Sequence, residues 1–404
     1  MPESTQKRER AGGGGLTLTL LIGISYGVSY GFYLVLSRVL PISMFGIVGS
    51  YLAFLGLLTL ASTAITFSAS RLVAEEGTAA RAASVRSGYL SYLLPLALAA
   101  IAIGILAALQ SLELAILIAT AGIVPLRDLH CGLLSGLKLN FRWGAVVLIE
   151  SIIRLGGAAA TAWFPYAWLA LTAWLVSLAV GTLLGMAFLP RKVLERAAAP
   201  PRLKRTTVEA ALFRAPQVSF LNIDVVIAAA VFGMNDAAGL GLYVGAATLS
   251  RIPFYLATSH ALGEMATITE EKGKGPATGR AIRYGLLLSA LFAIPLVVLP
   301  GLALTILLGP AYAPAAALLS LLAMTSFFLV QANTLSTILF ASGRGQLSAS
   351  LMITGASLEI VLGTIGVSTA GATGLAIATV VAAVATTLLL VAPMLASWHT
   401  GSKR

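Results

Sequence analysis

Twelve apolar runs, each long enough to approach or exceed the thickness of a lipid bilayer, dominate this chain of 404 residues. A transmembrane helix needs about 20 predominantly apolar residues. Soluble domains carry about 25% charged residues, whereas this chain has 10% charged and 58% hydrophobic residues, which excludes a soluble fold. The predicted spans are 13–36, 47–69, 87–108, 112–136, 143–163, 166–189, 215–233, 241–265, 285–308, 315–340, 347–367 and 373–397.

The Lys and Arg residues lie almost entirely in alternate gaps between these spans. All but four of the 26 occupy the termini and every second gap, with the largest group in 190–214. Cytoplasmic loops are enriched in Lys and Arg, so we expect a multi-pass protein of the cell (plasma) membrane with both termini cytoplasmic. The net charge of +11 then reflects topology, and no nucleic-acid partner is expected.

The basic gap at 190–214 divides the spans into two sets of six. An even number of spans per set means that both sets enter the membrane from the same side, so a repeat would be parallel. We expect an all-α membrane protein, a monomer, with two pseudo-symmetric six-helix lobes around a central cavity. The expected parts are an N-terminal tail (1–12), an N-lobe (13–189), a basic cytoplasmic linker (190–214), a C-lobe (215–397) and a C-terminal tail (398–404).

Ionisable residues inside two spans of the N-lobe are candidates for function, because each costs about 2.5–3.5 kcal/mol at the bilayer centre. Arg127 and Asp128 follow Pro125 in the fourth span. In the fifth span Glu150 precedes Arg154 by four residues, the favourable order for an ion pair within one helix. Two interpretations remain open: the four charges neutralise one another, or the arginines bind an anionic group.

A second group of ionisable residues lies in the C-lobe. Asp224 and Arg251 lie at matching depths of about 14 and 15 Å at 1.5 Å per residue, which is compatible with a structural ion pair or with a substrate or ion site. Glu359 has no obvious partner and is a candidate protonation switch or a neutral hydrogen-bonded acid. His260 and Glu264 are four residues apart, but His260 is about 180° around the helix from Arg251, and we favour Arg251.

The first span combines tyrosines with regularly spaced glycines. Tyr26 and Tyr30 lie deep in the span, where they could line a polar cavity or stack on sugar rings. Anchoring at the membrane interface is the alternative. The residues Gly23, Gly27 and Gly31 recur every fourth position, a spacing that favours close helix packing.

Nothing in the sequence has the spacing of a catalytic triad, a phosphate-binding loop or a metal-ligand cluster. The chain has three histidines and one cysteine, Cys131, which lies inside a span, so no disulfide framework, metal or cofactor is expected. The outer gaps are too short to build a catalytic surface. We therefore expect a transport protein, not an enzyme, and an intramembrane transferase is the least favoured alternative.

Several short segments resemble, in order, motifs of polysaccharide-biosynthesis flippases. The segments are Leu36-Ser37-Arg38-Val39-Leu40-Pro41 followed by Phe45-Gly46, then Asn222-Ile223-Asp224-Val225, Ala238-Gly239, Leu308-Gly309, Ala341-Ser342-Gly343-Arg344 and Gly374-Leu375-Ala376. Over about residues 15–395 the chain resembles Wzx-type oligosaccharide flippases of the multidrug/oligosaccharidyl-lipid/polysaccharide exporter superfamily. The resemblance implies alternating access by two six-helix lobes. Lipid II flippases of this superfamily usually have fourteen spans, whereas twelve are predicted here. Proton-coupled multidrug exporters often carry an acid in the first span, and the first span of this chain contains no acid.

The resemblance implies a polyprenyl-linked oligosaccharide, or a related lipid-linked glycan, as cargo and membrane lipids as surroundings. The residues expected to bind substrate are Arg127, Arg154, Arg251, Tyr26 and Tyr30. The residues expected to couple an ion, Na⁺ or H⁺, or to stabilise the lobes are Asp224, Asn222, Asp128, Glu150 and Glu359. The alternative function is ion-coupled export of organic cations, which gains support because carboxylates outnumber arginines inside the spans.

Overall fold

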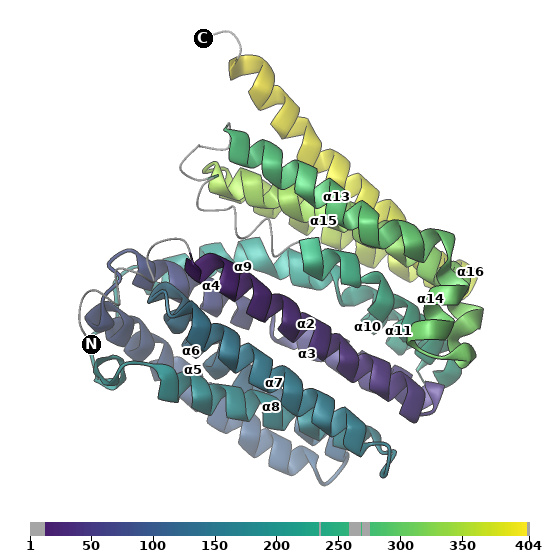
Figure 1. Ribbon diagram of the computed structural model, residues 1–404, viewed down its shortest axis with the longest axis horizontal. Coiled ribbons are helices and arrows are strands. Elements are labelled where there is room, and N and C mark those ends of the chain that lie inside the picture. Colours follow the sequence, from purple (N-terminus) through teal and green to yellow (C-terminus); the bar gives the residue numbers. More distant parts are fainter. Residues whose placement is uncertain (1–12, 234–235, 258–267, 269–274, 402–404) are drawn as a thin grey trace. The chain divides into compact units, whose positions relative to one another are not determined.

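The computed structural model describes residues 13–233, 236–257, 268 and 275–401 (Figure 1). Over these residues every regular element is a helix, because a bilayer offers no partner for exposed backbone polar groups. The chain divides into two compact units: unit 1 comprises Met1–Val39 and Leu58–Arg214, and unit 2 comprises Leu40–Leu57 and Ala215–Arg404. His260, Glu264 and the predicted N-terminal tail lie outside the described residues.

Unit 1 is a helical bundle in which α2 runs along α7, α7 along α8, and α6 contacts α4, α5 and α8 (Figure 1). The approach of α4 to α6 depends on glycine: a Cβ at Gly132 would lie 2.6 Å from the Thr66 carbonyl oxygen. The helices are α2 (Gly13–Val39), α4 (Leu60–Ala74), α5 (Ala79–Ala107), α6 (Leu112–Gly136), α7 (Asn140–Ala160), α8 (Ala167–Phe188), the 3-10 helix η1 (Arg191–Leu194) and the first part of α9 (Leu203–Phe220).

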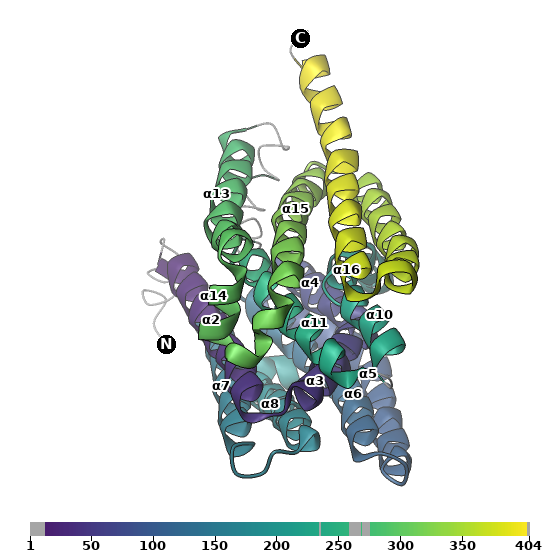
Figure 2. The ribbon, with the colours of Figure 1, turned by 90° about the vertical axis from the view of Figure 1, so that its right-hand side faces the viewer.

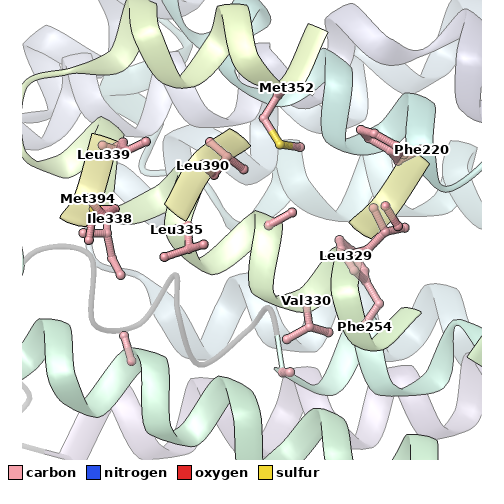
Figure 3. Close-up of a cluster of buried hydrophobic side chains, with 14 of the residues drawn as sticks. Phe220, Phe254, Leu329, Val330, Leu335, Ile338, Leu339, Met352, Leu390 and Met394 are labelled. Atoms are coloured by element: carbon pink, nitrogen blue, oxygen red, sulfur yellow. The ribbon is translucent and has the colours of Figure 1, made fainter. Parts of the chain in front are cut away.

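Unit 2 is built around α15, which packs against α13, α16 and α11 (Figure 2). Figure 3 shows part of its apolar core, where Leu329, Val330 and Leu335 of α15 lie among side chains of other helices. The helices are α3 (Ile42–Leu58), α10 (Ile223–Phe232), α11 (Ala237–Ser250), α13 (Pro276–Val298), α14 (Pro300–Leu307), the 3-10 helix η2 (Pro310–Ala315), α15 (Ala316–Ala341) and α16 (Gly345–Gly401).

Six helices of the described part are long and apolar enough to cross a membrane, and up to eight if each of two bent pairs counts as one span. The longest, Gly345–Met394, has 50 residues. At 1.5 Å per residue it would measure about 75 Å, more than twice the hydrocarbon thickness. Its backbone is non-helical at Ala370 and Gly371, where Gly371 has φ 59°, a conformation that glycine adopts at little cost. The break falls in the gap predicted at 368–372, so α16 supplies two spans of this multi-pass membrane protein.

Two predicted spans are each composed of two helices. The span at 47–69 corresponds to α3 and α4, which are separated at Thr59. The span at 215–233 corresponds to the end of α9 and to α10, which meet at an angle of 47°. Because α9 begins at Leu203, the segment that joins α8 to α9 is shorter than the linker predicted at 190–214. The apolar run did not reveal this start, because the first turns of α9 carry Lys204 and Arg205.

Candidate functional site

A cluster of four charged side chains joins α6 to α7 inside unit 1. Arg127 donates two parallel hydrogen bonds to Glu150, from Nε to Oε1 at 2.8 Å and from Nη2 to Oε2 at 2.6 Å. Its Nη1 donates to Oδ1 of the adjacent Asp128 at 2.9 Å. Bidentate pairs of this kind are among the strongest side-chain hydrogen bonds. Arg127 therefore holds both carboxylates of the cluster.

Arg154 completes this cluster and extends it to α8. Its Nη2 donates to Glu150 Oε2 at 3.1 Å and its Nε donates to Ser177 Oγ at 3.1 Å. Its guanidinium carbon lies 4.3 Å from the ring centroid of Trp174, in a cation–π contact. The ion pair predicted within the fifth span is confirmed, and it is one part of a larger network.

The four charges of the cluster sum to zero, and the side chains that carry them are largely buried. The side chain of Glu150 is 0% exposed, and that of Arg127 keeps 17% of its surface accessible. A Cβ at Gly181 of α8 would overlap Glu150 Oε1, so glycine at this position makes room for the carboxylate. A buried ion that loses its partner is strongly destabilising, so the mutual pairing of two arginines with two carboxylates explains how the bundle tolerates them.

Arg214 is a further arginine of unit 1, and it lies at the end of the segment predicted as the linker. It lies in α9, about 17 Å from the helix start at 1.5 Å per residue, and is half-buried. It interacts electrostatically with Tyr26 of α2, which also interacts with Arg127. The sequence contains one indication that α9 begins before the apolar run. The segment from Leu203 to Arg214 contains neither proline nor glycine and is therefore compatible with a helix.

The first helix presents its tyrosines and glycines in different settings. Tyr26 and Tyr30 are both half-buried, and the ring of Tyr30 lies 6.3 Å from that of Tyr33. The glycine packing is confirmed only at Gly31, where a Cβ would lie 3.3 Å from Leu155 of α7. It is wrong at the other two positions, Gly23 and Gly27, where a Cβ would meet nothing within 4 Å. A hydrogen bond of 2.8 Å between Ser29 and Ser151 instead fastens α2 to α7.

Unit 2 contains the ion pair predicted between the seventh and eighth spans. Arg251, at the C-terminal end of α11, donates from Nη2 to Asp224 Oδ1 of α10 at 2.8 Å. Tyr243 donates its hydroxyl hydrogen to Asp224 Oδ2 at 3.3 Å. The side chains of Arg251 and Asp224 are 15% and 7% exposed. The pair is thus confirmed, and Tyr243 is a third member that the expected site residues did not include.

Glu359 lies deep in the first half of α16 and is 0% exposed. Neither of its carboxyl oxygens has a hydrogen-bond partner among the described residues. It interacts electrostatically with both Asp224 and Arg251. The described residues of unit 2 thus place two carboxylates near one arginine, whereas the unit 1 cluster is balanced.

Asn222 marks the break between α9 and α10. It occupies the N-cap position of α10, and its Nδ2 donates to the Val218 carbonyl oxygen at 2.8 Å. A Cβ at Gly56 of α3 would lie 2.8 Å from this nitrogen, so α3 passes close to the break. The side chain therefore stabilises the bend that leads into the helix carrying Asp224.

The described residues contain no group of three or more His, Cys, Asp and Glu side chains that could hold a metal ion. Cys131 is buried with a free thiol.

Solved structures of similar fold are membrane transporters. The lipid II flippase MurJ in an inward closed conformation matches with a TM-score of 0.72 at 13% identity, over 93% of this chain and 87% of that chain. An outward-facing multidrug resistance MATE family transporter of the MOP superfamily matches with a TM-score of 0.65 at 17% identity, over 93% of each chain. A MOP superfamily transporter from Pyrococcus furiosus Vc1 matches with a TM-score of 0.65 at 16% identity, over 96% of this chain and 95% of that chain.

These likenesses extend over almost the whole chain and establish a shared fold. No family model matches the sequence, and no curated protein matches it either. The protein therefore has the fold of MOP-superfamily transporters, a group of solved structures that includes both a lipid flippase and multidrug exporters.

Proposed function

We propose that this protein is a transporter that moves a polyprenyl-linked oligosaccharide, or a related lipid-linked glycan, across the cell membrane by alternating access. Its fold, shared with a lipid II flippase at a TM-score of 0.72, supports the transporter class. The flippase-like motifs between Leu36 and Ala376 support the glycan-lipid branch. The observation that carries the proposal is the grouping of Tyr26, Arg127 and Arg214.

In this grouping the phenol of Tyr26 lies within electrostatic reach of two guanidinium groups. Tyr26 interacts electrostatically with both arginines, and Arg127 keeps 17% of its side chain exposed although it holds two carboxylates. Guanidinium groups bind phosphate with directed, bidentate hydrogen bonds. In the proposal these residues contact the (pyro)phosphate of the lipid, Tyr30 lies beside the glycan, and Arg154 positions the cluster through Glu150 and Ser177.

The coupling ion is assigned to unit 2 in this proposal. Glu359 is a buried carboxyl group without a hydrogen-bond partner among the described residues. It lies within electrostatic reach of Asp224 and Arg251. An H⁺ or Na⁺ that binds Glu359 would change the charge beside the Asp224–Arg251 pair and so couple ion binding to the packing of α10, α11 and α16.

The test is a flipping assay with full-length protein reconstituted in liposomes that contain a fluorescent polyprenyl-pyrophosphate-linked oligosaccharide. We expect Arg214→Gln to lower the initial flipping rate at least about tenfold, the effect of losing one charge-assisted contact of about 1.4 kcal/mol or more. Tyr26→Phe should lower it less. The matched control is Arg71→Gln in the same unit, whose side chain is 51% exposed in a 3.6 Å pair with Glu209. Equal rates for Arg214→Gln and the control would refute the head-group role.

A second function is favoured by one observation, the unpartnered acid in unit 2. Asp128, Glu150, Asp224 and Glu359 are matched in number by Arg127, Arg154, Arg214 and Arg251, but of these four acids Glu359 is the one without a hydrogen-bond partner among the described residues. An exporter of organic cations would use Glu359 to bind its cargo. In the same liposomes, efflux of a cationic dye that Glu359→Gln abolishes would favour this function, and absence of dye efflux by the unaltered protein would reject it.

A further inference from the structure

A basic segment from Arg191 to Arg205, here named the basic strap, is fastened along the first turns of α5. Arg86 of α5 donates from Nη1 to the Leu194 carbonyl oxygen at 3.3 Å. The amide nitrogen of Ala197 donates to Ser87 Oγ at 3.1 Å, and Ser84 donates its hydroxyl hydrogen to the Ala198 carbonyl oxygen. Three consecutive parts of the strap are thus bonded to one helix.

Apolar contacts fix the same segment. Val193 is fully buried and Leu203 is 5% exposed, so both ends of the strap are anchored in the core of unit 1. A Cβ at Gly88 of α5 would lie 2.7 Å from Leu203 Cδ2 and 2.9 Å from Ala199 Cβ, so the strap approaches the helix as closely as a glycine permits. The strap is a shaped surface of unit 1, and its backbone is held in place.

The strap presents a concentrated positive charge to its surroundings. Its cations are all exposed, and they are Arg191, Lys192, Arg196, Arg202, Lys204 and Arg205. The acids nearby are few: Glu195 is exposed, and Glu209 of α9 is engaged by Arg205 at 3.0 Å and by Arg71 at 3.6 Å. The surplus of positive charge is therefore directed outward from a fixed backbone.

The length and the exposed apolar residues of α5 indicate where the strap would meet a bilayer. With 29 residues, α5 measures about 43 Å at 1.5 Å per residue, longer than the hydrocarbon core of about 30 Å. Its exposed large apolar side chains begin at Tyr92 and continue to Leu106. The strap contacts Ser84 to Gly88, which precede this lipid-facing stretch by about one turn. In a bilayer the cations of the strap are therefore expected at the level of the phosphodiester groups.

We propose that the basic strap is a binding site for the headgroups of anionic phospholipids. Juxtamembrane clusters of four to eight Lys and Arg residues attract anionic lipids, by about 1 kcal/mol, which is about fivefold in affinity, for each cation. Positive charge in cytoplasmic gaps is general in membrane proteins, and the general attraction that it exerts on anionic lipids does not require a backbone held in one place. The bonds from Arg86, Ser84 and Ser87 distinguish the strap, and the site is independent of the cargo proposed above.

The test measures lipid binding to the full chain in a neutral detergent by native mass spectrometry, with dioleoylphosphatidylglycerol compared with dioleoylphosphatidylcholine. The variant Arg191→Gln/Lys192→Gln/Arg196→Gln removes three strap cations, and the control Lys138→Gln/Arg283→Gln/Arg344→Gln removes three exposed cations from other gaps. We expect the preference for phosphatidylglycerol to fall at least about tenfold in the strap variant and less than about twofold in the control. An equal fall in both variants, or no preference in the unaltered protein, would overturn the proposal.

Two further arms separate the headgroup from other sources of the same chemistry and test the role of the fixed backbone. Inorganic phosphate and glycerol phosphate at millimolar concentration should not displace bound phosphatidylglycerol, and displacement by either would identify a site for free phosphate and reject the headgroup. Ser84→Ala/Ser87→Ala keeps every cation and removes two strap bonds. It should lower the preference several-fold, and an unchanged preference would contradict the requirement for a fixed strap.

Discussion

Unit 1 and unit 2 both bury ionised side chains, but they compensate them differently. In unit 1, Glu150 is bound by Arg127 and Arg154, and Asp128 is bound by Arg127. In unit 2, Arg251 is bound to Asp224, and Glu359 remains without a hydrogen-bond partner among the described residues. Every carboxylate of the first cluster is paired with an arginine, whereas the second group contains one carboxyl group more than it has arginines.

This difference separates a structural network from a responsive one. A proton or a substitution at Glu150 removes a partner from two buried guanidinium groups, which a low-dielectric interior penalises strongly. A proton or cation at Glu359 breaks no hydrogen bond to any residue that the structure describes, because the carboxyl group makes none with them. Unit 2 is therefore the better place for a group that exchanges an ion, and unit 1 is the better place for a rigid scaffold.

The largest effect is expected at the centre of the closed cluster. Glu150→Gln leaves Arg127 and Arg154 buried with a neutral amide, and breaking a buried pair costs about 3–5 kcal/mol. The free energy of unfolding should fall by about this amount, measured by thermal unfolding of the purified protein in detergent. Glu195→Gln, at an exposed glutamate of the basic strap, is the control and should change it by less than about 0.5 kcal/mol. Similar stability for both variants would show that the cluster is not a structural element.

An intermediate effect is expected for Asp224→Asn in unit 2. Arg251 loses a charge-assisted hydrogen bond, worth about 1.5–3 kcal/mol, but Glu359 remains within electrostatic reach and supplies a second negative charge. The loss should therefore be smaller than for Glu150→Gln. In a double-mutant cycle with Glu359→Gln, the combined loss should exceed the sum of the single losses by at least about 0.5 kcal/mol. Strict additivity would contradict the idea that Glu359 compensates Arg251.

The sequence predicted the helices and the local pairs better than it predicted the long-range network. Apolar run length predicted the helices, and the short gap predicted at 368–372 contains the break in α16. The Glu150–Arg154 pair follows from helical spacing and the Asp224–Arg251 pair from equal depth. The first rule uses the spacing of residues within one helix and the second uses depth along a span, and both can be counted from the sequence.

The missed features depend on how helices are rotated and where charged turns begin. Mutual neutralisation of the four charges was one of the two sequence interpretations, and the ion pairs bear it out. The bidentate contact of Arg127 with Glu150, however, requires two helices to face one another, and no spacing rule gives that rotation. Arg214 was missed because hydropathy marks where apolar residues start, at 215, whereas α9 starts twelve residues earlier in a charged segment. The separation of α3 from α4 at Thr59 could not be predicted from a proline, because that segment contains none.

The smallest effect on stability is expected for Glu359→Gln. The carboxyl group makes no hydrogen bond with the described part of the chain that the amide would lose, so the free energy of unfolding should stay within about 1 kcal/mol of that of the unaltered protein. Ion-dependent stabilisation should respond instead: if Na⁺ binds at Glu359, added Na⁺ raises the melting temperature of the unaltered protein and leaves that of the variant unchanged. Choline at the same ionic strength is the control. A loss of stability as large as that of Glu150→Gln would mean that Glu359 is held by a strong partner, and the contrast between the two units would then fail.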